Sequence, residues 1–105
     1  MPKAYLKCRH YGIAPICFSG EYAIIFRELI QETGERNNWC IINKSDLVKK
    51  IDEEKGLVRV DLLGSQINSF LVEINNPGDH KLSRFYVPRK EIVFSVKEYQ
   101  ENIRW

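Results

Sequence analysis

The sequence predicts a single domain, residues 1–105, of the mainly β class, folded as a small barrel of short strands. Runs rich in β-branched and aromatic residues are separated by turn signals roughly every 8 to 12 residues, a spacing typical of sandwiches and barrels. In addition, an apolar extended run that ends at a turn-forming residue occurs twice, about half a chain apart. The composition agrees with this class, because 44% hydrophobic and 29% charged residues suffice for one buried core without metals or disulfides.

The first half is expected to contain two clear strands and one short helix. Residues 4–11 are rich in strand-forming residues and are followed by a glycine and a proline, which favours a strand that ends there. Residues 38–43 form another apolar extended run, which predicts a second strand. Residues 45–55 are expected to form a short helix, with Ser45 as the N-cap and Gly56 as the stop.

Residues 20–33 carry signals for both a helix and a strand. Apolar residues recur at helical spacing between Ser19, placed as an N-cap, and Gly34, placed as a stop. The alternative fold is therefore α+β, with a helix over about residues 20–33 packed on an antiparallel sheet. Against the helix, residues 22–26 are β-branched and aromatic and correspond to residues 70–74 in the second half. We favour the strand because of that correspondence.

The second half is expected to contain four strands. Residues 56–64 resemble the first strand of the chain and end, as it does, at a glycine. Residues 70–74 and 84–87 are expected to pair as a hairpin across a strong turn signal at residues 75–79. Residues 91–96 are expected to form the last strand.

The two halves, residues 4–48 and 56–93, resemble each other. Each ends in a turn-forming residue, Asn43 or Pro88, followed by a base, any residue, an acid and an aliphatic pair. The further correspondences are Leu6 with Val58, Lys7 with Arg59, Cys8 with Val60, His10 with Leu62 and Cys40 with Phe85. Few residues are identical, so an internal repeat is a hypothesis that the sequence leaves open.

Residues 85–93 resemble the closing segment of SH3-like barrels. In those barrels a strand runs into an apolar residue and a proline, a single 3₁₀-like turn and a last short strand, here residues 87–88, 89–91 and 92–93. The resemblance implies a small SH3-like barrel. Its peptide-binding members carry an asparagine and then a tyrosine in the turn, where this chain has Lys90 and Glu91, which counts against recognition of proline-rich peptides.

Charge and cysteine content bound the possible partners and the compartment. The net charge of +2 is too small to indicate nucleic acid by itself, although residues 1–20 hold three bases and no acid. The longest apolar run, residues 23–26, is far shorter than the roughly 20 residues needed to cross a bilayer, so we expect no membrane partner. Three irregularly spaced cysteines, Cys8, Cys17 and Cys40, indicate reduced thiols, and we expect a cytoplasmic protein.

No motif of the chain predicts catalysis or metal binding. Cys8 and His10 could in principle hold zinc, but structural zinc sites usually show two such ligand pairs, and core packing explains these residues as well. His10 and His80 are the two histidines, and neither lies in a nucleophile motif. We therefore expect no catalytic residue, no metal and no cofactor, and an enzyme with a Cys/His site is the least favoured function.

Bases interleaved with aromatic residues form the candidate binding surface. It comprises Arg84, Tyr86, Arg89 and Lys90, joined by Lys44 and Trp39 from the first half. Such a surface suits nucleic acid, because basic side chains neutralise phosphates and aromatic rings stack on nucleobases. The chain is expected to be a non-catalytic interaction module that binds a protein partner in an adaptor or regulatory role, with nucleic-acid binding as the alternative and the oligomeric state open.

Overall fold

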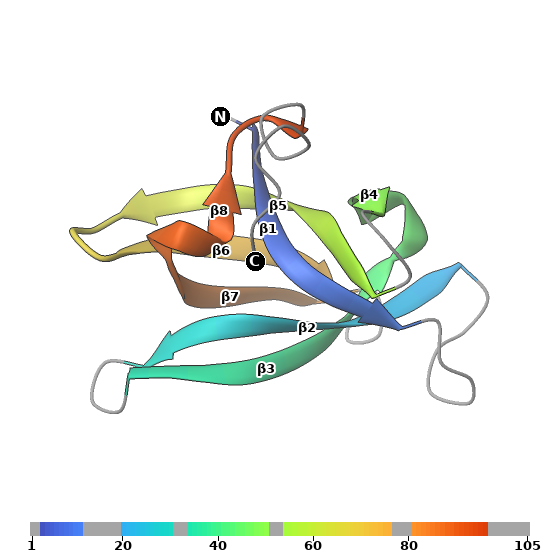
Figure 1. Ribbon diagram of the computed structural model, residues 1–105, viewed down its shortest axis with the longest axis horizontal. Coiled ribbons are helices and arrows are strands. Elements are labelled where there is room, and N and C mark those ends of the chain that lie inside the picture. Colours follow the sequence, from blue (N-terminus) through green and yellow to red (C-terminus); the bar gives the residue numbers. More distant parts are fainter. Residues whose placement is uncertain (1–2, 12–19, 31–33, 51–53, 77–80, 97–105) are drawn as a thin grey trace.

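The computed structural model describes residues 3–11, 20–30, 34–50, 54–76 and 81–96. Within these residues the chain forms eight strands and two single-turn 3₁₀ helices, and the strands make one antiparallel sheet that is nearly closed into a small barrel (Figure 1). The mainly β class is therefore confirmed. The architecture is consistent with an SH3-like fold in general.

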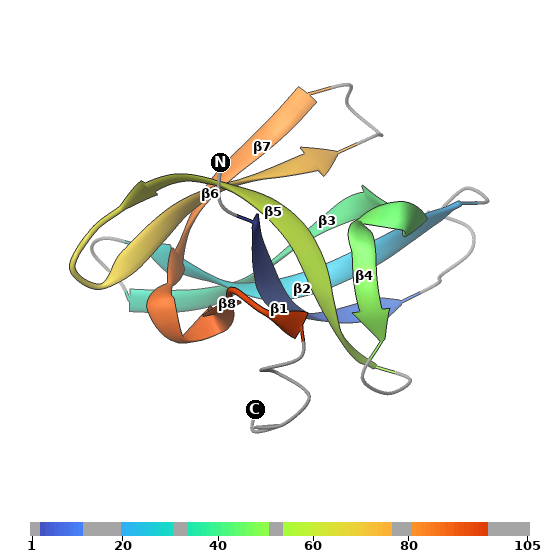
Figure 2. The ribbon, with the colours of Figure 1, turned by 90° about the horizontal axis from the view of Figure 1, so that it is seen from above.

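The strands run in two successive sets along the chain. The first set is β1 (Lys3–Tyr11), β2 (Glu21–Ile30), β3 (Gly34–Asn43), the 3₁₀ helix η1 (Lys44–Asp46) and β4 (Leu47–Lys50). The second set is β5 (Lys55–Ser65), β6 (Ser69–Asn76), β7 (Lys81–Pro88), the 3₁₀ helix η2 (Arg89–Glu91) and β8 (Ile92–Val93). The order across the sheet is β3-β2-β1-β5-β6-β7, with β4 paired to β5 and β8 paired to β1 (Figure 2). The middle of the sheet is thus the antiparallel pair β1 and β5.

The expected strands are present where the sequence placed them. They were predicted at residues 4–11, 38–43, 56–64, 70–74 and 84–87, and each falls within β1, β3, β5, β6 or β7. The predicted hairpin pairs β6 with β7 from Ser69 opposite Pro88 to Asn76 opposite Lys81. Most of its predicted turn, residues 75–79, lies outside the described residues.

Residues 21–30 form a strand, so the alternative helix over 20–33 is wrong. β2 pairs with β3 along its whole length, from Glu21 opposite Asn43 to Ile30 opposite Gly34, and also with the end of β1. The backbone of β2 is therefore paired with β3 along its whole length and with β1 from Ala23 to Ile25, and its isoleucines and aromatic residues suit a strand. Gly34 has a φ of 87°, so it serves the turn between two strands.

Two other expectations at the ends of the halves are corrected. The short helix predicted over residues 45–55 is absent from the described part of that segment, where η1 is followed at once by β4. β4 pairs with β5, which places Leu47 opposite Val58 and beside the core. In addition, the side chain of Asn43, the residue before η1, makes no capping hydrogen bond that would support a longer helix. The last strand is also shorter than predicted, because β8 covers only Ile92–Val93 and follows η2.

The closing segment has the form that the SH3-like resemblance implies. Val87 is fully buried near the end of β7, Pro88 precedes the single turn of η2, and β8 then pairs with Tyr5 and Leu6 of β1. Because β8 comes from the end of the chain and β1 from its beginning, this pairing helps to close the barrel.

The two sets of strands pair in the same order. β1, β2 and β3 pair in succession, as do β5, β6 and β7, and each half sends its short last strand to the central strand of the other half. On the ladders, Ile25 lies opposite Trp39, and Glu73 lies opposite Arg84 at the equivalent place in the second half. The internal repeat itself stays a prediction.

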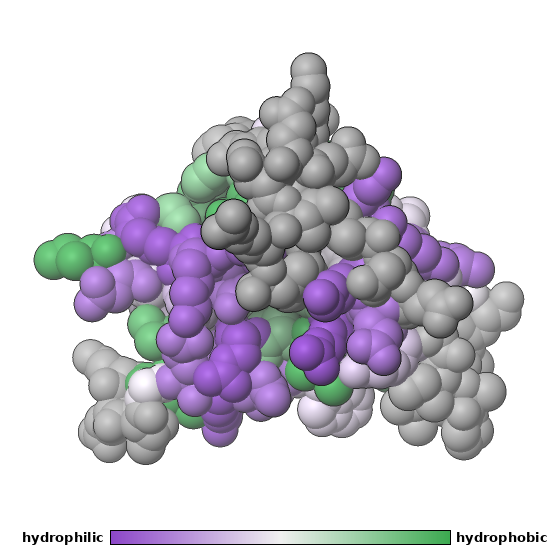
Figure 3. Space-filling model, viewed as in Figure 1, coloured by the Kyte–Doolittle hydropathy of each residue, from purple (hydrophilic) through white to green (hydrophobic). Residues whose placement is uncertain are grey.

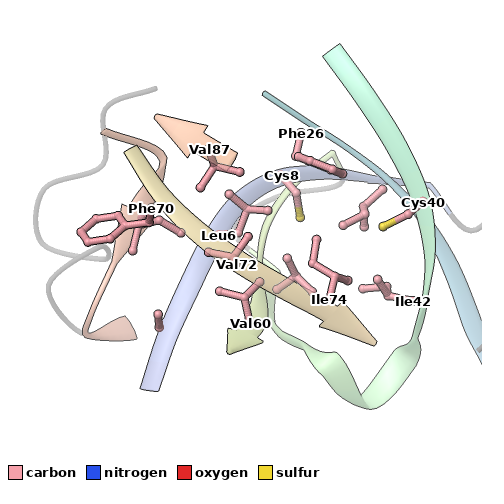
Figure 4. Packing of buried hydrophobic residues seen from close by; sticks show 14 residues of the cluster. Leu6, Cys8, Phe26, Cys40, Ile42, Val60, Phe70, Val72, Ile74 and Val87 are labelled. Carbon is pink, nitrogen blue, oxygen red and sulfur yellow. The ribbon is translucent and has the colours of Figure 1, made fainter. Parts of the chain in front are cut away.

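Side chains from most strands fill one core between the two ends of the sheet (Figure 4). The core consists of Ala4, Leu6, Cys8, Ile24, Phe26, Cys40, Ile42, Val58, Val60, Phe70, Val72, Ile74, Val87 and Ile92. The rings of Phe26 on β2 and Phe85 on β7 meet edge to face at 4.9 Å between centroids. This contact joins two strands that are far apart in the sheet order, so it holds the barrel together where its ladder is open.

Candidate binding surfaces

The structure distributes the six predicted surface residues over four elements. Arg84 and Tyr86 lie on β7, and Arg89 and Lys90 form part of η2. Trp39 lies on β3, and Lys44 begins η1. These side chains have different neighbours, and a single basic and aromatic surface made of all six stays a prediction.

Arg84 forms an ion pair within the sheet. Its Nε donates a hydrogen bond of 2.8 Å to Oε2 of Glu73, which lies directly opposite on β6. The Glu73 side chain is only 10% exposed, while that of Arg84 is 65% exposed. The guanidinium charge is therefore largely matched by an acid on the same face.

Arg89 fastens the loop between β5 and β6. Its Nε donates to the carbonyl oxygens of Gln66, at 2.8 Å, and Ile67, at 3.0 Å, while its Nη2 donates to Ser65 Oγ and again to the Gln66 carbonyl. The guanidinium also lies 4.3 Å from the ring centroid of Phe70. Most of the N–H donors of Arg89 thus bind groups of this protein, so few remain for an anionic ligand.

Lys90 connects η2 to the start of β3. Its ammonium group lies 3.1 Å from Oε2 of Glu35. This hydrogen bond is the main reason that the pKa of Glu35 is lowered, and Arg27, 3.5 Å away on β2, adds to the effect. Both ends of the pair are exposed, so it is a weak contact that salt would screen.

Lys44 and Trp39 lie on either side of the β2–β3 hairpin. The Lys44 ammonium is 5.6 Å from the ring centroid of Tyr22, which also accepts a hydrogen bond from Lys50 at 2.5 Å. That hydrogen bond is the main cause of a lowered pKa of Tyr22. Trp39 is 60% exposed, and its ladder neighbour is Ile25.

A first groove runs beside the β5–β6 loop. One part, of about 170 Å³, is lined by Leu29, Gln66, Ser69 and Tyr86, and an adjoining part, of about 560 Å³, is lined by Leu29, Ile30, Gly34, Gln66, Ile67, Asn68 and Ser69. We call these residues together the loop groove. Sequence reasoning found Tyr86 but missed Ile67, although an isoleucine within a Gly-Ser-Gln-Ile-Asn-Ser turn segment was a signal that could have indicated it.

A second groove, of about 400 Å³, crosses the outer face of β1 and β2 beside η2. It is lined by Lys7, Cys8, Arg9, Tyr11, Ile25, Phe26, Arg27, Asn37 and Glu91. We call it the basic groove, because these described residues include three basic side chains and one acidic side chain. Over β2 and β3, Figure 3 shows mostly hydrophilic residues with hydrophobic ones between them. Sequence reasoning missed these residues as a site, although the excess of bases in residues 1–20 was a visible signal.

Cys8, Cys40 and His10 are buried. Cys8 and Cys40 are free and buried, and His10 is 5% exposed with its ring against that of Tyr22. Burial raises the pKa of Cys8, and it raises the pKa of Cys40 to about 12. Neither thiol can therefore supply a thiolate near neutral pH. Within the described residues no group of three potential ligands could hold a metal ion, and Cys17 and His80 lie outside them.

Comparisons of the chain with protein-family models, with curated proteins and with solved structures found no match. Among the described residues, no helix has the length and apolar character that crossing a membrane requires.

Proposed function

We propose that this protein is a non-catalytic interaction module that binds a protein partner through the loop groove, with Ile67 as its central apolar contact. This proposal concerns a surface that displays apolar side chains on a fixed backbone. Such surfaces bind other proteins because burying the apolar side chains is favourable and little conformational entropy is lost.

The observation that carries the proposal is the environment of Ile67. Its side chain is 91% exposed, yet the backbone on both sides of it is held by hydrogen bonds. Arg89 binds the carbonyls of Gln66 and Ile67, and the amide of Gln66 donates to the Ser69 carbonyl at 2.8 Å. Hydrophobic atoms project at the left end of the molecule in Figure 3, over the loop between β5 and β6. The loop thus presents a large aliphatic side chain to solvent in a defined position.

The rest of the loop groove supports a protein partner. Leu29 and Ile30 of β2 and the 42% exposed ring of Tyr86 supply apolar surface, while Gln66 and Asn68 supply amides at its edge. An apolar centre with a polar border and an exposed tyrosine is typical of protein interfaces. None of the described residues that line the groove is basic or acidic, so their charge does not favour a nucleic acid there.

Affinity capture with three forms of the protein tests this function. Ile67→Asp places a charge at the proposed centre, and Leu63→Asp places the same charge at an exposed leucine of β5 that lines neither groove. We expect one protein to be retained by the wild type and by Leu63→Asp and to be lost with Ile67→Asp. Equal retention by all three forms would exclude the loop groove as the binding surface.

Sedimentation of the purified protein distinguishes a second copy of the chain from a different protein. A dimer of the wild type that Ile67→Asp dissociates would identify the partner as a second copy. A monomer at all concentrations would leave the captured protein as the partner. Circular dichroism of each variant should match that of the wild type, since both substituted side chains are exposed.

A further inference from the structure

A row of three residues crosses the outer face of the first three strands. Arg9 of β1 lies opposite Ile25 of β2, and Ile25 lies opposite Trp39 of β3. Their neighbours in sequence, among them Ile24 and Cys40, point into the core, so alternation directs this row outward. Trp39 is 60% exposed, and Arg9 is exposed as well. The face therefore offers an indole ring beside a guanidinium group, with an aliphatic side chain between them.

The basic groove continues from this row. Lys7 and Arg27 line it together with Arg9, and Glu91 of η2 is the one acid among the described residues of the lining. Arg27 donates a hydrogen bond of 3.0 Å to Asn37 and lies 3.5 Å from a carboxylate oxygen of Glu35; these contacts hold its guanidinium at the groove and match part of its charge. Among the described lining residues Lys7, Arg9 and Arg27 outnumber Glu91, and Glu35 beside Arg27 still leaves an excess of one positive charge, so a ligand with several negative charges would fit the groove.

The equivalent row in the second half has a different chemistry. There, Asp61 of β5 lies opposite Glu73 of β6, and Glu73 lies opposite Arg84 of β7. Glu73 and Arg84 form an ion pair at 2.8 Å, so the one basic side chain of this row is matched within the sheet and Asp61 leaves the row with an excess of one acid. The same arrangement of strands thus carries an ion pair and an extra acid in the second half, whereas in the first half it presents a basic side chain and an exposed tryptophan.

We propose that the basic groove, extended by Trp39, binds single-stranded nucleic acid. Lys7, Arg9 and Arg27 neutralise phosphates, and the Trp39 indole stacks on a nucleobase. The exposed ring favours a nucleic acid over an acidic peptide, because every base has a flat face that stacks on an aromatic side chain, whereas acidic side chains gain nothing from the indole. The basic groove and the loop groove share no described residue. The nucleic acid would therefore be a second partner, in addition to the proposed protein partner.

Fluorescence anisotropy with labelled 12-nucleotide single-stranded DNA and RNA tests this site. We expect binding at 50 mM salt that weakens steeply at 200 mM, because counterions are released from the phosphates. Trp39→Ala should weaken binding about 5- to 150-fold, the range that loss of one stacked base implies. Arg9→Glu should weaken it by at least about tenfold and reduce the salt dependence.

Matched variants in the second half provide the controls. Arg84→Ala changes the residue equivalent to Trp39, and Arg59→Glu reverses a base equivalent to Lys7; we expect both to bind within about twofold of the wild type. Ile67→Asp should also bind normally, which separates this site from the loop groove. An equal loss with Arg59→Glu and Arg9→Glu would overturn the proposal, because it would indicate a general effect of net charge.

Two other outcomes would also overturn it. No binding of either single strand at 50 mM salt would exclude the site, provided that the wild type melts cooperatively under the same conditions. Tighter binding of a labelled polyglutamate peptide than of either single strand would replace the nucleic acid by an acidic protein segment. Tighter binding of duplex DNA than of either single strand would identify duplex DNA, and not single-stranded nucleic acid, as the ligand of the basic groove.

Discussion

Leu6 of β1 and Val58 of β5 lie directly opposite each other in the middle of the sheet, and both are fully buried. Each also pairs with a short strand on its other side, Leu6 with Ile92 and Val58 with Leu47. Each central strand is thus held at the same point by its counterpart and by the last strand of the other half. The stability of the barrel should therefore depend strongly on this pair.

Truncation of Leu6 tests that dependence. Leu6→Ala is expected to lower the free energy of unfolding by about 2–5 kcal/mol, because it removes buried methyl groups and leaves a cavity. Arg59→Ala, next to Val58 but on the outer face, should change it by no more than about 0.5 kcal/mol. Urea denaturation measures both. Similar midpoints for the two variants would show that the β1–β5 pair is not central to stability.

The glycines of β5 differ in the space around them. A methyl group on Gly56 would lie 2.8 Å from the carbonyl oxygen of Lys49 and 3.0 Å from both His10 and Leu47, whereas one on Gly64 would lie 3.7 Å from Leu71. Gly56→Ala is therefore expected to destabilise the fold by about 1–3 kcal/mol, since β4 would have to move.

Gly64→Ala is the control for that substitution. It should be neutral or slightly stabilising, because it restricts the unfolded chain without a clash. Thermal unfolding of the two variants gives the comparison. A melting temperature for Gly56→Ala equal to that of Gly64→Ala would contradict the close packing of β4 on β5.

The Arg89 contacts predict a specific defect in the loop. Arg89→Lys cannot reproduce the planar set of donors that reaches Gln66, Ile67 and Ser65. We expect a loss of about 1–3 kcal/mol in stability and faster hydrogen exchange of the Gln66 amide. Lys90→Ala, one residue further, should leave that amide unchanged. Unchanged exchange in Arg89→Lys would mean that the loop is held by other contacts.

The buried thiols predict a dependence of stability on pH. Burial raises the pKa of Cys40 to about 12 and also raises that of Cys8, whereas a thiol in the unfolded chain has a pKa of about 8.5. Above pH 9 the unfolded state binds fewer protons than the folded state, so the free energy of unfolding falls as the pH rises. Each thiol can contribute up to about 1.4 kcal/mol per pH unit, and neither contributes below about pH 8.

Denaturation at pH 7.5 and at pH 10.5 measures this effect. Cys40→Ala should lose less stability between the two pH values than the wild type, because one buried titrating group is gone. The two proteins differ only at residue 40, so contributions from their common groups cancel in the comparison. An identical loss in the two proteins would contradict the burial of the Cys40 thiol.

Much of the fold could be predicted because strand signals are local. The β-branched and aromatic residues at 22–26 indicated a strand although the spacing of apolar residues there also fits a helix, and the structure has a strand. The closing turn at 89–91 could be predicted from the order of its residues. The prediction of a helix over 45–55 was wrong because the spacing of apolar residues in this segment suits a helix and a strand equally. What decides between them is the pairing of Leu47 with Val58, a contact between segments that no local pattern contains.

The binding surfaces were harder to predict, because register and loop contacts decide which charges are available. Arg84 looked free in the sequence, but the register of β6 and β7 places Glu73 opposite it. Arg89 looked like a phosphate ligand, but the fold directs it to carbonyls of the β5–β6 loop. Arg9 and Trp39 are 30 positions apart, and only the order of β1, β2 and β3 brings them to one row.

Photocrosslinking from position 67 inside the source cells tests the proposed protein-binding surface most directly. We expect a photoreactive residue at position 67 to crosslink to one protein, and the yield to fall when Arg89→Lys is added, because the loop then loses its fixed position. The same residue at position 63 should not give this product. Absence of a product at position 67, or the same products from both positions, would contradict the account.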